Sequence, residues 1–362
     1  MKDTICILVP GRLDRPIGGH KIIYQYANHL AESGFPVIIA NSIFEPSNEK
    51  FFTEILRRGY AFIRFVYRAI KGKNSCRNWF TLNKRITVAH VWSYSARFIP
   101  TADIYIATDA TTSPFLIHYP AATDKKYYFI QGYENWRLTA KQLIETYHLP
   151  LKKIVISHWI NDLLTRIGES CVIIPNGFDP KEYYLTIPIE QKEKNHISML
   201  YHEDPIKNSA MGFRALNIVK KSIPDLKVSV FGVYSKPRDL PSYCTYFQSP
   251  DLDLHRHINN SASIYIGTSD NEGWGLTIME AMACGQAIAC TSNYGYQEIA
   301  VNEANALLSP IGNENDLAIN IIRLIEDDRL RWRIAGCGYR SVQSYSINNC
   351  AAQFERYISS YS

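Results

Sequence analysis

The 362-residue sequence lacks the features that mark membrane-spanning, disulfide-rich and zinc-binding proteins. No apolar run approaches the ~20 residues that a membrane-spanning helix needs. The eight cysteines are scattered without a Cys-x-x-Cys pair, which favours reduced thiols in a cytoplasmic compartment. No signal-peptide cleavage pattern follows the amino-terminal residues. With 46% apolar residues, 20% charged residues and no low-complexity tract, the composition is that of a packed globular protein.

Acidic residues are absent from the segment 55–102. The segment is basic and interleaved with aromatic side chains: Arg57, Arg58, Arg64, Arg68, Lys71, Lys73, Arg77, Lys84, Arg85 and Arg97, with Tyr60, Phe62, Phe65, Tyr67, Trp79 and Phe80. Such a segment suits an anionic surface, either lipid headgroups or a polyphosphate. The alternative is a solvated helix face whose aromatic side chains lie in the core.

The chain is longer than one hydrophobic core usually supports, so we expect two domains. Thr4–Pro10 and Pro36–Ala40 are short apolar runs typical of buried parallel strands. Between them Gly18 and Gly19 open a segment of helical periodicity, which Gly34 ends. Strand, helix and strand in so short a span form a βαβ unit and imply a parallel sheet.

The same alternation continues along the chain and restarts after the polar stretch Ile189–Asn195, the best candidate for a domain boundary. We expect strands at 104–108, 127–131, 153–157, 172–175, 197–202, 227–232, 263–268, 287–291 and 306–309, and helices from about 209, at 252–260, at 275–284 and from about 315 to the end. Two such sets predict an α/β protein of two Rossmann-like, doubly wound domains. Their ligands should bind at the carboxyl ends of the strands.

The most informative segment is Ser269–Ala283 (SDNEGWGLTIMEAMA), which lies between two apolar strands. Gly273 and Gly275 permit a tight strand-to-helix turn and a close approach of ligand to backbone. The amides of Gly275, Leu276 and Thr277 then lack helical partners, and this arrangement is a natural anion site.

Two glutamates flank this turn, Glu272 before the helix and Glu280 about two turns into it. Carboxylates on either side of a bound phosphate can accept hydrogen bonds from hydroxyls on both sides of it, as a nucleotide sugar presents them. The alternative is an ordinary helix start at which the dipole stabilises Glu272.

This segment resembles the signature of the retaining glycosyltransferases of family four, a glutamate followed by seven residues and a second glutamate. The residues that carry the resemblance are Glu272-Gly273-Trp274-Gly275-Leu276 and Glu280-Ala281-Met282-Ala283-Cys284-Gly285. Gly18-Gly19, Ile174–Asp179, Gly295–Glu298 and Asn305–Pro310 extend it over most of the chain. The resemblance implies the GT-B fold, two Rossmann-like domains facing across a cleft: 1–180 on the acceptor side, 181–345 binding the donor, and a last helix at 346–362 packing back on the first domain.

The resemblance also assigns roles to single residues. It implies that Glu280 binds the ribose hydroxyls and Glu272 the donor sugar. Gly275, Leu276 and Thr277 would hold the diphosphate. The other residues expected to bind the nucleotide sugar are Gly18, Gly19, His202, Gly273 and Trp274. Lys207 matches the family's lysine and should neutralise the leaving diphosphate.

The sequence departs from the family at two positions. His202 occupies the place of the family's arginine, and Arg12 or Arg15 could supply that charge instead. Gln131 follows the strand that often ends in a histidine, and it can hydrogen-bond a sugar hydroxyl but cannot act as a base. Retaining transfer in this family is generally attributed to front-face attack assisted by the leaving phosphate, so the missing base is compatible with transfer. His118 is a nearby alternative.

Two other patterns predict ordinary structure. Asp251-Leu252-Asp253 precedes an expected helix, where Asp is a good N-cap, so no metal is expected. Gly336-Cys337-Gly338 lacks the βαβ context of a dinucleotide fingerprint. Since no Gly-x-Gly-x-x-Gly follows either first strand, a dehydrogenase is disfavoured.

The resemblance therefore implies a metal-independent hexosyl- or deoxyhexosyltransferase that moves a sugar from a nucleotide sugar to a glycan or lipid-linked glycan with retention. A sugar-nucleotide epimerase of the same fold and a non-catalytic sugar-nucleotide-binding subunit stay open as alternatives. No nucleic-acid motif is present. The expected location is the cytoplasm, peripheral to the inner membrane face if residues 55–102 bind lipid, and the expected role is in surface polysaccharide synthesis.

Overall fold

The computed structural model describes residues 2–14, 16–44, 51–71, 74–135 and 137–360, and for residues 51–57 the backbone alone. The chain divides into two compact units, which we call unit 1 (Met1–Pro175 with Cys350–Ser362) and unit 2 (Asn176–Asn349). The first division lies inside the expected link Ile174–Asp179, a few residues before the expected boundary at 180.

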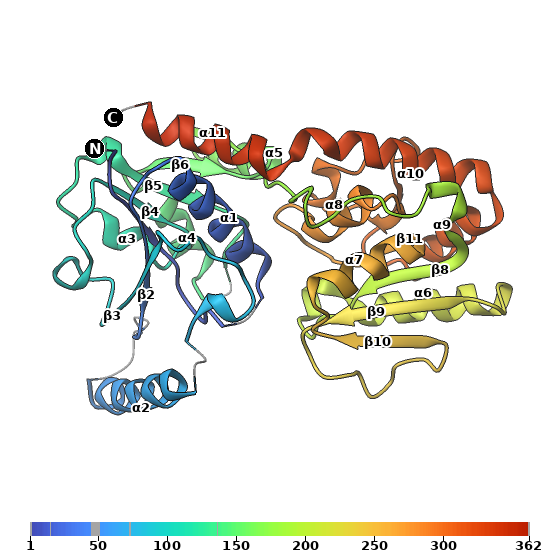
Figure 1. Ribbon diagram of the computed structural model, residues 1–362, viewed down its shortest axis with the longest axis horizontal. Coiled ribbons are helices and arrows are strands. Elements are labelled where there is room, and N and C mark those ends of the chain that lie inside the picture. Colours follow the sequence, from blue (N-terminus) through green and yellow to red (C-terminus); the bar gives the residue numbers. More distant parts are fainter. Residues whose placement is uncertain (1, 15, 45–50, 72–73, 136, 361–362) are drawn as a thin grey trace. The chain divides into compact units, whose positions relative to one another are not determined.

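Unit 1 is built on a seven-stranded parallel sheet (Figure 1). Its strands, in spatial order, are β3 (Thr87–Val91), β2 (Val37–Ser42), β1 (Ile5–Leu8), β4 (Ile104–Ala107), β5 (Lys126–Ile130), β6 (Lys152–Val155) and β7 (Cys171–Ile173). Its helices are α1 (Gly18–Glu32), α2 (Phe51–Ile70), α3 (Ser113–Leu116), α4 (Ala140–Tyr147), α5 (His158–Arg166) and most of α11 (Ile347–Ser359). The central strands β1, β4 and β5 are buried along their whole length, because parallel sheets are covered on both faces.

Unit 2 repeats this architecture with six parallel strands. Their order is β10 (Cys244–Gln248), β9 (Lys227–Gly232), β8 (Glu193–Leu200), β11 (Ala262–Gly267), β12 (Ala287–Thr291) and β13 (Leu307–Ser309). The helices are α6 (Ser209–Ser222), α7 (Leu252–Ser261), α8 (Leu276–Ala283), α9 (Glu314–Glu326) and α10 (Asp328–Val342). The predicted pair of doubly wound Rossmann-like units is confirmed. The strand order reverses at β1/β4 in unit 1 and at β8/β11 in unit 2, where such folds bind ligands.

The last helix, α11, packs on the sheet of unit 1. The Phe354 ring lies 4.7 Å from Tyr26 and 5.6 Å from Phe129, centroid to centroid. Glu355 accepts hydrogen bonds from Ser33 Oγ at 2.8 Å and lies 2.8 Å from His29 Nε2, tying α11 to the end of α1. Aromatic burial and this polar contact together hold the end of the described chain on the first unit.

The polar stretch Ile189–Asn195 lies inside unit 2 and contains the start of β8, so it is not a linker. Lys192 is buried, and its ammonium donates to the carbonyls of Asn259 (3.2 Å) and Asn260 (2.5 Å). Burial lowers the pKa of Lys192 to about 7. The polar composition of this stretch therefore serves internal hydrogen bonds as well as solvent.

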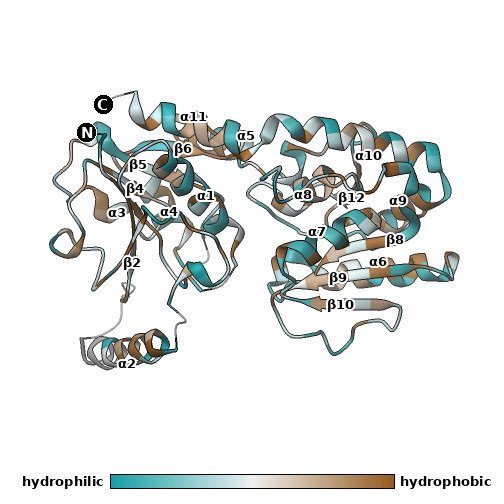
Figure 2. Cartoon of the chain, viewed as in Figure 1, coloured by the Kyte–Doolittle hydropathy of each residue, from teal (hydrophilic) through white to brown (hydrophobic). Residues whose placement is uncertain are grey.

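Several smaller expectations can be compared directly with the structure. Asp251 caps α7, since its Oδ1 accepts from the Leu254 amide at 2.8 Å. Gly336 and Gly338 lie in the middle of α10 rather than in a phosphate loop. All eight cysteines are free thiols and six are buried. Among the described helices, none combines the length and hydropathy needed to cross a membrane. Figure 2 shows hydrophobic and hydrophilic residues mixed along the helices.

The segment that leaves unit 1 is clamped at Gly177. Next to it the Phe178 amide donates to the Tyr345 carbonyl at 3.0 Å, and the Ile347 amide donates to the Phe178 carbonyl at 2.7 Å. A β-carbon on Gly177 would lie 2.7 Å from the Ile347 backbone nitrogen and α-carbon. Backbone atoms cannot move aside as a flexible side chain can, so glycine is required there.

We therefore expect Gly177→Ala to lower the free energy of unfolding by about 1–3 kcal/mol, the usual cost of overpacking. Gly336→Ala is the matched control, because its β-carbon would meet the Arg340 side chain at an ordinary 3.5 Å in a helix interior. The control should be stabilised by roughly 0.5–1 kcal/mol. Denaturant unfolding of both variants measures the difference, and equal stabilities would contradict the clamp.

Candidate active site

The centre of the candidate site in unit 2 is an ion pair between Lys207 and Glu272. Lys207 ends a 3-10 turn after β8, and Glu272 lies in the loop after β11. Because β8 and β11 are paired in parallel, the loops that follow them meet at one edge of the sheet. The Lys207 ammonium donates to both carboxylate oxygens of Glu272, at 2.7 and 2.8 Å, and the two side chains are 26% and 15% exposed.

A hydrogen-bond relay holds the Glu272 carboxylate from the other side. Tyr296 OH donates to Ser269 Oγ at 3.2 Å, and Ser269 Oγ donates to Glu272 Oε1 at 2.7 Å. Asn293 Nδ2 donates to the Ser269 carbonyl at 2.9 Å and fixes the loop. Burial, reinforced by the charge of Glu272, raises the pKa of Tyr296 well above its usual value, so the phenol stays a donor.

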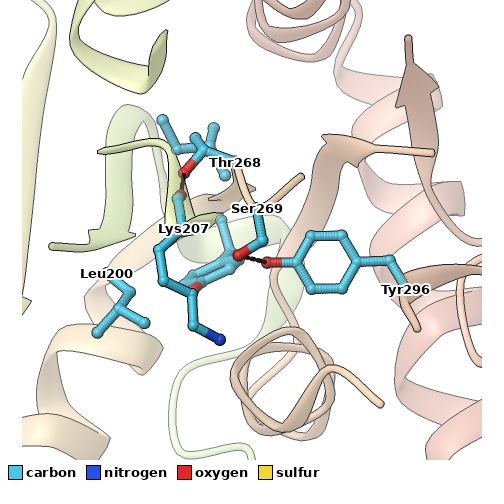
Figure 3. Close-up of a pocket in the computed structure, with 7 residues that line it drawn as sticks. Leu200, Lys207, Thr268, Ser269 and Tyr296 are labelled. Atoms are coloured by element: carbon cyan, nitrogen blue, oxygen red, sulfur yellow. Dashed lines mark hydrogen bonds between the residues drawn. The ribbon is translucent and has the colours of Figure 1, made fainter. Parts of the chain in front are cut away.

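Figure 3 shows the small pocket that these groups line, with the Lys207 side chain beside Ser269 and Tyr296. The Lys207 backbone carbonyl accepts from Thr268 Oγ1 at 2.8 Å, which ties the lysine turn to the end of β11. Tyr265, fully buried, lies beneath the pocket. The pocket therefore has a polar wall of hydroxyls around one ammonium group.

The turn into α8 has the backbone geometry that the sequence predicts. Gly275 has φ +122°, a conformation that a side chain would strain. No side chain caps α8, and Leu276 and Thr277 in its first turn are half-buried. A β-carbon on Gly295 would lie 2.3 Å from the Glu272 carbonyl oxygen, so Gly295 permits close packing of the loop that carries Glu272. The first amides of α8 are available to an anion.

Glu280 is buried in the second turn of α8, on the same element as this open end. Burial raises the pKa of Tyr265, its hydrogen bond with Thr277 opposes the rise, and the charges of Glu272 and Glu280 add to it. The charges of both glutamates therefore act on the Tyr265 hydroxyl. Trp274 is buried edge-on against Tyr345, with centroids 5.4 Å apart. Trp274 thus packs the turn against Tyr345.

His202 replaces the family's arginine, but it is held as a neutral hydrogen-bonding group. Its Nδ1 accepts from the Asp204 amide at 2.9 Å, and its ring packs edge-on against Tyr234 with centroids 4.8 Å apart. Burial, reinforced by the positive charge of Lys207, lowers the pKa of His202. A histidine that accepts a backbone hydrogen bond at a lowered pKa does not supply the second positive charge near pH 7.

In unit 1 the predicted residues Gly18, Gly19 and Gln131 come together. Gln131 follows β5, and its Nε2 donates to the Gly19 carbonyl at 3.4 Å at the start of α1. A β-carbon on Gly19 would lie 3.3 Å from Gln131, so the approach is tight. Gln131 Oε1 is buried without a hydrogen-bond partner in the described part of the chain. His118 is exposed instead.

The alternative arginines have different surroundings. Arg12 pairs with Asp14, its Nη2 lying 2.9 Å from Asp14 Oδ2, and Arg15 lies outside the described residues. The sequence pattern missed His20, which follows the two glycines. Burial lowers the pKa of His20 to about 4, against the opposing charge of Asp109. Proximity to Gly19 is the signal that could have identified it.

The segment that carries this geometry is similar to known proteins. Residues 190–340 match the family described as "Glycosyl transferases group 1". The chain is 22% identical over 229 residues to the phosphatidyl-myo-inositol mannosyltransferase of Mycolicibacterium smegmatis, covering 59% of this chain and 58% of that protein. It is 31% identical over 219 residues to the N,N'-diacetylbacillosaminyl-diphospho-undecaprenol alpha-1,3-N-acetylgalactosaminyltransferase of Campylobacter jejuni, covering 57% of each chain. The matches thus span less than three fifths of these relatives' lengths.

Among solved structures, Anabaena HepE in complex with UDP-glucose superposes with a TM-score of 0.73. That comparison covers 99% of this chain and 100% of HepE at 14% sequence identity, a level that speaks for the fold. The matched segment 190–340 contains the ion pair, its supporting relay and the turn into α8. The chain thus has the GT-B fold, and its residues 190–340 match the glycosyl transferases group 1 family.

Proposed function

We propose that the chain is a glycosyltransferase that moves a hexosyl or deoxyhexosyl group from a nucleotide sugar to a hydroxyl acceptor with retention of anomeric configuration. The observation that carries the proposal is the Lys207–Glu272 ion pair, held by Ser269 beside the uncapped start of α8. One cation, one carboxylate and a row of free amides match a diphosphate joined to a sugar.

In this proposal the ion pair exchanges partners when the donor binds. The diphosphate oxygens accept from the α8 amides and from Lys207, which then stabilises the charge of the leaving group. Glu272, released from the lysine, accepts hydrogen bonds from the sugar hydroxyls. Glu280 accepts from the ribose hydroxyls. In unit 1 the unsatisfied Gln131 Oε1 accepts from a substrate hydroxyl, and no protein base is needed if the leaving phosphate takes the acceptor proton.

The acceptor proposed is a glycan or a lipid-linked glycan bound by unit 1. Two relatives carry lipid acceptors in their names, phosphatidyl-myo-inositol and diphospho-undecaprenol. Helix α2, whose features fit such a substrate, lies outside the matched family segment. With this acceptor, we propose that the protein acts at the cytoplasmic face of a membrane in the synthesis of a surface glycan.

The alternatives make different products from the same donor. A glycosyltransferase releases nucleoside diphosphate in proportion to glycosylated acceptor. An epimerase inverts the sugar at C2, and a non-catalytic subunit binds the nucleotide sugar without turnover. Incubation with a panel of nucleotide sugars, followed by nucleotide chromatography and NMR of the sugar, separates the three.

Substitution of the two glutamates should affect donor binding and turnover differently. Glu280→Gln should weaken nucleoside diphosphate binding roughly tenfold, about 1.4 kcal/mol, because an amide is a poorer acceptor for two hydroxyls than a carboxylate. Glu272→Gln should lower kcat with little loss of nucleoside diphosphate affinity, since it loosens the sugar and frees Lys207. Calorimetric titration and steady-state rates measure the two effects. Wild-type affinity and wild-type rate in both variants would show that the donor binds elsewhere.

We also propose that transfer needs no metal ion, because Lys207 and the α8 amides neutralise the diphosphate. Dialysis against EDTA should leave the initial rate unchanged, and added Mg²⁺ or Mn²⁺ should not raise it. A rate lost on chelation and restored by either ion would contradict this assignment. Asp253 would then need testing as a ligand, although it already pairs with Arg256.

Helix α2 presents an apolar face to solvent. Ile63, Tyr67 and Ile70 are 68%, 62% and 79% exposed, and Phe62 and Val66 on the same side are also exposed. Three aromatic residues of this helix, Tyr60, Phe62 and Tyr67, therefore lie outside the core. Phe65 packs on His90 instead, and Trp79 and Phe80 pack on Tyr24. An amphipathic helix with an exposed apolar face next to basic residues fits the surface of an anionic membrane.

We expect reversible binding to anionic vesicles, led by this apolar face and weakened by salt, since each basic residue near the surface adds about 1 kcal/mol. The double variant Ile63→Ser, Ile70→Ser should abolish co-sedimentation with phosphatidylglycerol vesicles. Its matched control, Ile311→Ser with Ile319→Ser, removes two exposed isoleucines (48% and 55%) from unit 2 and should pellet as wild type. Equal pelleting of both double variants would refute the membrane role of α2.

A further inference from the structure

A second pocket lies wholly within unit 1, with a volume of about 560 Å³. Its walls are the loop after β1 (Gly11–Leu13), the end of β2 (Asn41–Ile43), one side of α2 and His90. Four arginines line it: Arg12, Arg64, Arg68 and Arg137. Among the described residues that line it, none is Asp or Glu. A cavity of this size accommodates a small polar group with its attached chain.

The two faces of α2 have different surroundings, one the pocket and the other solvent. Tyr60, Arg64 and Arg68 recur every four residues, so they share one side of the helix, and all three line the pocket. Ile63 and Ile70 lie on the opposite side and are exposed, and Figure 2 shows hydrophobic residues along α2. The expectation that the arginines of this segment contact a lipid surface is thus modified, because Arg64 and Arg68 line a pocket.

Counted over the described side chains that line or adjoin it, the pocket has a net positive charge. Asp14, beside it, accepts from Arg12 at 2.9 Å and from Arg68 at 2.5 Å, so one carboxylate serves two guanidinium groups. Although burial alone would raise it, hydrogen bonds from Arg12 and Arg68 lower the pKa of Asp14 overall, so it is ionised at neutral pH. Arg64 adds a further exposed positive charge on the same wall. The Asp14 carboxylate orients Arg12 and Arg68, and its single negative charge does not neutralise the charges of both.

The loop that carries Arg12 is fixed before any ligand binds. Asn41, buried at the end of β2, donates its Nδ2 to the carbonyls of Val9 (2.8 Å) and Gly11 (2.9 Å). Trp79 Nε1 donates to the Leu13 carbonyl at 2.8 Å from the other side. A pre-organised arginine loses less conformational entropy on binding than one on a free loop.

We propose that this arginine pocket binds the phosphate or diphosphate group of the acceptor, which makes a phosphorylated acceptor the substrate class of the proposed transferase. Guanidinium groups bind phosphate oxygens in a bidentate geometry, and several converging on one site suit a multiply charged anion. The apolar face of the same helix would rest at the lipid surface, which puts the pocket at headgroup depth. A lipid-linked acceptor carries its phosphate at that depth.

The test is direct binding of pyrophosphate, measured by calorimetry in a Lys207→Gln background so that the site in unit 2 does not compete. Adding Arg64→Gln should weaken pyrophosphate binding at least tenfold. Arg85→Gln is the matched control, because Arg85 is exposed and does not line the pocket, and it should leave the affinity unchanged. Equal affinities in the two variants overturn the proposal. The binding measurement involves no donor and no turnover. If unit 1 bound pyrophosphate as predicted but the wild-type protein transferred no sugar, only the proposed function would be contradicted.

A second arm separates the acceptor's phosphate from the headgroups of bulk lipid. Arg64→Gln should co-sediment with phosphatidylglycerol vesicles as the wild type does, since Arg64 lines the pocket and the apolar face leads membrane binding. If Arg64→Gln lost vesicle binding while its pyrophosphate affinity matched that of Arg85→Gln, the arginines would serve bulk headgroups and the pocket assignment would be wrong. Circular dichroism of each variant confirms the fold before either comparison.

Discussion

The ion pair between Lys207 and Glu272 is the contact on which the candidate donor site depends. It exists because β8 and β11 are adjacent parallel strands, so the loops after them end at one edge of the sheet. An ion pair between partly exposed side chains contributes little to stability by itself. Its importance is positional: Ser269, backed by Tyr296, holds the carboxylate, and Glu272 holds the ammonium beside the uncapped start of α8.

Unit 1 differs from unit 2 in what its loops present. The tight contact between Gly19 and Gln131 resembles a hydroxyl-binding corner without a base. Helix α2 has two different faces. One is apolar and exposed to solvent, and the other carries arginines that line a pocket. In the function that we propose, unit 2 binds the donor and unit 1 binds a phosphorylated, lipid-anchored acceptor.

Much of the donor turn is predictable from the sequence, because Gly273, Gly275 and two flanking apolar strands specify it locally. The support of Glu272 is not predictable, since Tyr296 lies 27 residues from Ser269 along the chain and meets it only through the fold. The polar stretch at 189–195 wrongly predicts a domain boundary, because Lys192 is buried and its ammonium donates hydrogen bonds to carbonyls of α7. The orientation of α2 also depends on tertiary contacts, which composition does not encode.

The most direct test of the account is the affinity of nucleoside diphosphates for the Lys207→Gln variant, measured by calorimetry against Lys221→Gln. Lys221 is an exposed lysine at the end of α6 and controls for loss of surface charge. The account predicts at least tenfold weaker binding for Lys207→Gln, about 1.4 kcal/mol, and wild-type binding for Lys221→Gln. Wild-type affinity in both variants would show that Lys207 serves Glu272 alone and would contradict the donor site proposed for unit 2.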